Sequence, residues 1–132
     1  MTVQLSVAVR NARLDQIETT TGTAPTLTMR TGSPPANCAA ARSGTVLATI
    51  ALPTDWLAAA ASGAKGITGG PWTDASADAS GTFGHFSIDQ GATCHIQGTA
   101  GIAGTDMIVD SAVITILQSF SITAFTLTDG NA

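Results

Sequence analysis

Charged residues are scarce in this chain, and tyrosine is absent. Of 132 residues, five are Lys or Arg and nine are Asp or Glu, which makes a charged fraction of 11%, against roughly 25% in an ordinary globular protein. The net charge of −4 argues against nucleic acid as a partner, because phosphate binding needs clustered Lys and Arg. A surface so poor in ions costs little to desolvate, which favours permanent contacts between proteins.

Long apolar runs are also missing. No run approaches the roughly 20 residues that cross a bilayer, and the first residues lack the charged and apolar regions of a secretory signal. We therefore expect no membrane partner and synthesis in a cytoplasm. The two cysteines, Cys38 and Cys94, are more typical there of small buried hydrophobic residues than of a disulfide, but their pairing stays open.

Recognisable catalytic and metal-binding patterns are lacking. No Gly-x-Ser-x-Gly turn precedes a predicted helix, and Gly69-Gly70 leads into Pro71-Trp72 rather than into a helix with a lysine. Cys94 and His95 are neighbours on a predicted strand, so their side chains point to opposite faces and cannot readily share one ion. We therefore expect no enzyme, no catalytic residue, no cofactor, no metal and no small-molecule substrate.

Aromatic residues make up only 5% of the chain, which is little for a carbohydrate-binding surface. Trp56 and Trp72 are suited to stacking on a sugar, but as large apolar side chains they more often anchor a core or a loop. A module that binds host glycans therefore stays an alternative function.

Short alternating segments dominate the rest of the sequence. Leu27 and Met29 alternate with polar residues, and the residues from 45 to 52 repeat this period before Pro53. Gly91 predicts a hairpin in which Ile88 faces Thr93. Residues 106–110, 113–117 and 119–128 predict a second meander, with a β-bulge near Ala124 and Phe125, where the apolar phase slips. The pattern predicts a mainly β fold, an antiparallel β-sandwich or jelly roll.

Two helices are predicted beside the strands. Residues 4–19 contain no Gly or Pro, and Thr54 is placed to cap a short internal helix over residues 55–61 that Gly63 ends. Residues 66–80 have the composition of a long surface loop. We expect residues 1–20 to be an N-terminal helix or docking arm, and residues 21–132 to be a single β-sandwich domain.

The N-terminal helix carries mixed charge and two readings of it stay open. In one, its charged residues form a solvated face. In the other, Leu14 and Ile17 fill a groove on a neighbouring protein while Arg10 and Arg13 pair with its carboxylates. These four residues are the predicted partner-binding site.

Several segments resemble a family of small virion proteins of tailed bacteriophages. The likeness spans nearly the whole chain and is carried by residues 9–19, 52–60, 81–86, 94–99 and 125–132. It implies a structural, non-enzymatic component similar to the cement or decoration proteins that clamp capsid subunits. It also implies location in the virion, with the major capsid protein and copies of the same chain, as a dimer or trimer, as partners. A structural component of the phage tail is the alternative.

Overall fold

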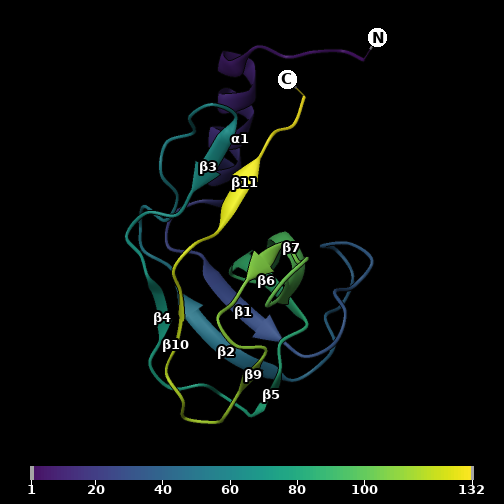
Figure 1. Ribbon diagram of the computed structural model, residues 1–132, viewed down its shortest axis with the longest axis vertical. Helices are drawn as coiled ribbons and strands as arrows, with labels where there is room; N and C mark the ends of the chain where they lie inside the picture. Colours follow the sequence, from purple (N-terminus) through teal and green to yellow (C-terminus); the bar gives the residue numbers. More distant parts are fainter. Residues whose placement is uncertain (1, 132) are drawn as a thin grey trace.

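The computed structural model describes residues 2–131 as a mainly β protein with one helix (Figure 1). Helix α1 spans Val7–Thr21 and lies at the end of the molecule where both chain termini emerge. The Ser6 hydroxyl caps it by accepting a hydrogen bond from the Val9 amide, and Gly22, with a φ of 94°, ends it. The predicted N-terminal helix is confirmed, two to three residues further along the chain than expected.

A five-stranded sheet in the order β2-β1-β6-β7-β8 forms the body. Its strands are β1 (Thr26–Arg30), β2 (Val46–Ala51), β6 (His85–Gln90), β7 (Thr93–Gly101) and β8 (Met107–Ile108). β1 pairs antiparallel with β2 and with β6, which confirms the first two predicted strands. β8 instead lies parallel to β7, so residues 106–110 do not begin the antiparallel meander that the sequence predicted.

Three two-stranded sheets accompany this body. They pair β4 (Trp72–Asp74) with β10 (Phe120–Ile122), β3 (Ala64–Gly66) with β11 (Thr126–Thr128), and β5 (Gly81–Thr82) with β9 (Val113–Ile114). In each pair the second strand comes from the C-terminal third of the chain and the first from residues 64–82. The expected loop over residues 66–80 therefore contains strand structure, because the C-terminal strands pair with it and not with one another.

The expected bulge near Ala124 and Phe125 is a complete strand break. β10 ends at Ile122 and pairs with β4, whereas β11 begins at Thr126 and pairs with β3. Ile122 and Phe125 are both buried, although residues three positions apart on one continuous strand would point to opposite faces. The change of apolar phase was located correctly, but it marks a move between two sheets.

The hairpin of β6 and β7 is confirmed with a different register. Gln90 faces Thr93 across a tighter turn, and Ile88 faces Ile96 rather than Thr93. The register shifts between Ile88 and Asp89, because Cys94 pairs with Asp89 and His95 is the extra residue of a bulge. Gly91, with a φ of 59°, lies in the turn as expected.

The short internal helix expected over residues 55–61 is not formed. Leu57 and Ala61 instead make isolated antiparallel bridges to Ile67 and Ala64. The Ala58 amide donates to the Gly66 carbonyl at 2.8 Å, as the Ala61 amide does to Ala64. Tertiary partners thus satisfy the amides that a helix would have used, and they override the local helix propensity of the alanines.

The core contains a row of aromatic rings that joins the sheets. Trp56 and Trp72 have ring centroids 6.2 Å apart, as do Trp72 and Phe125, and Phe86 of β6 meets Phe125 edge-on at 5.5 Å. Both tryptophans are buried. They anchor the core, and neither is accessible for stacking on a sugar.

Candidate partner-binding surface on helix α1

Helix α1 attaches to the body largely through polar side chains. Asn11, Asp15 and Glu18 lie four and three positions apart, which places them on one face of the helix. Their oxygens accept hydrogen bonds from the amides of Gly63, Ala60 and Leu57, at 2.9, 2.9 and 3.1 Å. This polar stripe satisfies the backbone of a segment that has no strand partner on that side. It therefore fixes the helix in one register along the segment.

Lys65 of β3 adds a buried cation to this contact. Its ammonium lies 2.8 Å from Asp15 Oδ1 and 3.0 Å from Glu18 Oε2, and it donates to the Ala58 carbonyl at 2.8 Å. Burial opposes its charge, but the hydrogen bonds to Asp15 and Glu18 prevail and raise the pKa of Lys65. The hydrogen bond from Lys65, with that from the Ala60 amide, lowers the pKa of Asp15. The cluster is thus a stable ion pair at neutral pH.

Arg10 and Arg13 contact the chain's own C-terminal segment. Arg10 Nη1 donates to the Asp129 carbonyl at 3.1 Å, and Arg13 Nη1 lies 3.1 Å from Asp129 Oδ2. The Asp129 side chain is 8% exposed, whereas the Arg13 side chain is 55% exposed. The carboxylate that was expected on a partner is thus supplied within the chain, but Arg13 retains donors for a second acceptor.

Leu14 and Ile17 differ in accessibility. Leu14 is only 4% exposed and packs within its own chain. Ile17 is half-buried and borders two shallow hollows of about 260 and 340 Å³, both of which also contact Arg13. Of the four predicted residues, Arg13 and Ile17 are therefore accessible to a partner in this conformation, and Arg10 and Leu14 hold the helix in place.

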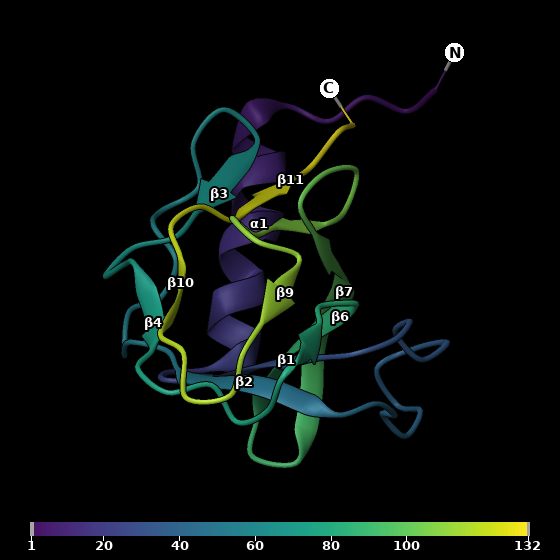
Figure 2. The same cartoon turned by 60° about the horizontal axis from the view of Figure 1, so that its bottom comes forward.

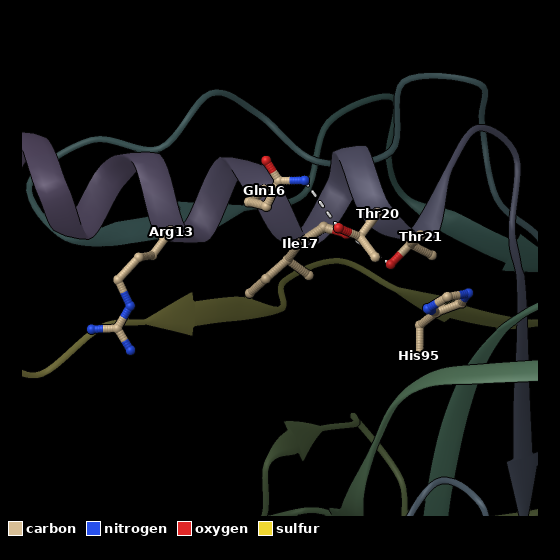
Figure 3. Close-up of a pocket in the computed structure, with 6 residues that line it drawn as sticks. All are labelled: Arg13, Gln16, Ile17, Thr20, Thr21 and His95. Atoms are coloured by element: carbon tan, nitrogen blue, oxygen red, sulfur yellow. Dashed lines mark hydrogen bonds between the residues drawn. The ribbon is translucent and has the colours of Figure 1, made fainter.

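The smaller hollow lies between α1 and β7 (Figure 3). Arg13, Gln16, Ile17, Thr20 and Thr21 line it from the helix, and His95 lines it from β7. The Gln16 amide donates to the Thr20 hydroxyl at 3.1 Å. We call Arg13, Gln16, Ile17, Thr20 and His95 the α1 surface. It offers one apolar side chain, one cation and several neutral donors, a combination suited to a protein contact.

His95 is a member of this surface that the sequence did not indicate. It is the residue that bulges from β7, and a bulge redirects the side chain it carries. The sequence offered no direct signal for this bulge. The polar stripe, by contrast, is visible in the sequence as Asn11, Asp15 and Glu18 at helical spacing.

A second exposed surface lies around the turn after β9. Val113, Ile116 and Leu117 are 56%, 52% and 74% exposed, within five consecutive residues. A hollow of about 280 Å³ beside them is lined by Phe83, Val113 and Phe120, among others. The sequence predicted a strand of the second meander over residues 113–117. In the structure this strand ends at Ile114, because the Ile116 amide donates a hydrogen bond to the Ser80 hydroxyl at 2.8 Å.

The remaining candidate chemistry is sparse over residues 2–131. No group of three or more His, Cys, Asp or Glu side chains in this range is arranged to hold a metal ion. The one helix in this range is too short and too polar to cross a membrane. Cys38 and Cys94, whose relationship the sequence left open, lie together as free thiols.

Comparison with known proteins adds no assignment to this geometry. No family model, curated protein or solved structure matches the chain, so the likeness to tailed-phage virion proteins remains a prediction from the sequence.

Proposed function

We propose that this chain is a structural protein of a tailed-phage virion, a cement or decoration protein that stabilises the capsid. The observation that carries the proposal is the combination of few charges with well-exposed apolar side chains on separate parts of the surface. Val113, Ile116 and Leu117 form one group, around the turn after β9, and Ile102 and Ile108 form another, beside the β7–β8 pair, each residue 51% exposed or more. Such surfaces favour burial against neighbouring subunits.

The mechanism is mass action. A part that binds the assembled shell, and not its separate subunits, stabilises the shell by its own binding free energy. A contact of roughly 1,600 Å² is the usual size for a specific protein interface. Repeated over many equivalent sites, it would resist the internal pressure of packaged DNA. The partners are the major capsid protein and copies of this chain, as a dimer or trimer, and the α1 surface supplies one contact.

We also propose an architecture for the β-rich body. The small sheets and the five-stranded sheet share one hydrophobic core, in which Ile114 of β9 and Ile122 of β10 join Leu27 and Ile50 of the larger sheet. In Figure 2, β4, β9 and β10 lie above β2. We therefore describe the body as sandwich-like, with a jelly roll as its nearest standard architecture.

An add-back experiment tests the function. Particles of the phage that encodes the chain are made without this protein, and their release of DNA on heating is followed with and without the purified chain. We expect the missing protein to lower the release temperature and the added protein to restore it. Unchanged release in both cases, with no protein bound to the particles, would refute the proposal.

Two matched variants test the α1 surface in the same assay. Ile17→Asp places a charge between the two hollows, whereas Val9→Asp places the same charge on the first turn of α1, outside them. We expect Ile17→Asp to weaken attachment at least tenfold and Val9→Asp to leave it intact, with both variants folded by circular dichroism. Equal attachment of both variants would show that α1 faces away from the partner.

A tail component is the alternative that shares this surface chemistry. It differs in assembly, because its copies would close into a ring on the tube and not lie on the shell. The glycan-binding alternative has no comparable support, since Trp56 and Trp72 are buried.

A further inference from the structure

Two cysteines that are far apart in the sequence meet in the fold. Cys38 Sγ and Cys94 Sγ lie 2.8 Å apart although 56 positions separate the residues. Cys38 lies in the segment of residues 31–45 that connects β1 to β2, and Cys94 is the second residue of β7. Figure 2 shows this segment as the long blue loop that extends beyond the ends of β1 and β2.

Other contacts place the segment against the hairpin without help from the thiols. Gln97 Nε2 of β7 donates to the Pro35 carbonyl at 2.8 Å, and Arg42 Nη1 lies 3.2 Å from Asp89 Oδ1 of β6. These two contacts bracket Cys38, and Asp89 and Gln97 bracket Cys94. The meeting of the two sulfur atoms is thus set by neighbours on both sides of each cysteine.

We propose that Cys38 and Cys94 form an intramolecular disulfide that latches residues 31–45 to the β6–β7 hairpin. The contacts between this segment and the hairpin are polar. Cys38 and Cys94 are themselves half-buried, so both thiols are partly accessible. Such contacts open readily, and a covalent bond would hold the segment closed. In a reducing cytoplasm the thiols stay free, and the latch closes once the protein reaches an oxidising environment.

Oxidised glutathione is the oxidant for this step. The Cys38 thiolate attacks one sulfur of the oxidant and displaces one glutathione thiolate, which takes up a proton. Cys94 then loses its proton to solvent and attacks the Cys38 sulfur, and the second glutathione leaves and is protonated. Two protein thiols are oxidised and one glutathione disulfide is reduced to two thiols.

The order of attack follows from the surroundings of Cys94. Burial, followed by the contact with Cys38, raises the pKa of Cys94 to about 12. Cys94 therefore stays protonated at neutral pH, and we assign the first attack to Cys38. Arg42 pairs with Asp89 beside this site, which limits the repulsion that Asp89 exerts on a second thiolate.

Intact mass spectrometry of the purified chain in oxidised glutathione tests the bond. The expected product has lost two hydrogen atoms, carries no glutathione and is a monomer on a non-reducing gel. Cys38→Ser and Cys94→Ser are the matched controls, and each is expected to retain one glutathione or one free thiol. Stable attachment of two glutathiones to the unaltered chain, or a disulfide-linked dimer, would overturn the proposal.

Trypsin gives a second readout, specific to the latch. Arg42 is the one trypsin site within residues 31–45, and a cut after it separates Cys38 from Cys94. In the oxidised protein we expect this cut to slow by about tenfold or more, and its two fragments to stay joined until a reductant is added. Equal cutting rates in the oxidised and reduced forms would show that the bond does not hold the segment.

Discussion

The buried ammonium of Lys65 lies 2.8 Å from Asp15 Oδ1 and joins β3 to helix α1. Lys65 is 2% exposed, while Asp15 retains access to solvent. Together with Glu18, this pair turns a helix of weak apolar periodicity into a fixed part of the fold. The helix therefore presents Arg13 and Ile17 in a defined position.

Lys65→Met tests how much this cation contributes. Its removal leaves two carboxylates beside each other and the Ala58 carbonyl without its donor. We expect the free energy of unfolding in urea to fall by about 1–3 kcal/mol. Asp55→Asn, a change at an exposed carboxylate, is the control and should stay within about 0.5 kcal/mol. A Lys65→Met protein as stable as the unaltered chain would mean that α1 needs no ionic anchor.

Asn11→Ala tests the polar stripe without altering charge. It leaves the Gly63 amide, which donates to Asn11 Oδ1 at 2.9 Å, without an acceptor. The expected cost is about 1 kcal/mol in urea unfolding. Gln16→Ala removes a similar amide from the exposed face of the same helix, and we expect its effect to be within about 0.5 kcal/mol. Equal effects of the two changes would show that the polar stripe does not anchor the helix.

Stability is expected to fall in acid because of Asp106 and Asp15. Hydrogen bonds from the amide and hydroxyl of Thr99 lower the pKa of Asp106 below its usual 3.8, and Lys65 does the same for Asp15. A depressed folded-state pKa stabilises the protein above pH 3.8, and this stabilisation is lost as the pH falls through the lower value. Asp106→Asn should therefore flatten the decline of melting temperature below about pH 4. If the melting temperature of the variant falls with pH as steeply as that of the unaltered chain, Asp106 does not contribute to the loss of stability in acid.

Gly84→Ala tests a close approach of two backbones. A methyl group at Gly84 would collide with the backbone of Gly32, which cannot move aside as a flexible side chain can. The expected destabilisation is about 1–3 kcal/mol. At Gly130 no atom lies near enough to meet an added methyl group, so Gly130→Ala is the control. Similar melting temperatures for the two variants would show that the segments separate without cost.

The sequence predicted those elements whose signals are local. Alternation located β1 and β2, the absence of Gly and Pro located α1, and Gly91 located the hairpin turn. The pairing of the C-terminal strands could not be predicted, since β9, β10 and β11 each pair with a strand far back in the chain. Residues 55–61 were misread because their amides bond to Glu18 and Asp15, and no local signal shows such partners.

The candidate site was predicted in part. The sequence identified α1 and its four residues, but no local signal shows that Leu14 is buried. The hydrogen bond from Arg10 to the Asp129 carbonyl depends on where the C-terminal segment lies. His95 joins the surface through a bulge that changes the hairpin register by one position. Such a shift depends on packing across the sheet and leaves no trace in apolar alternation.

We propose that neighbouring subunits of a virus particle cover the charge-poor surface of this protein. Cryo-electron microscopy of tailed-phage particles purified from cells that produce this chain tests the proposal. We predict density that fits this fold on the icosahedral shell at capsomer junctions, with α1 against its neighbours. Complete absence of the chain from the purified particles would refute the proposal.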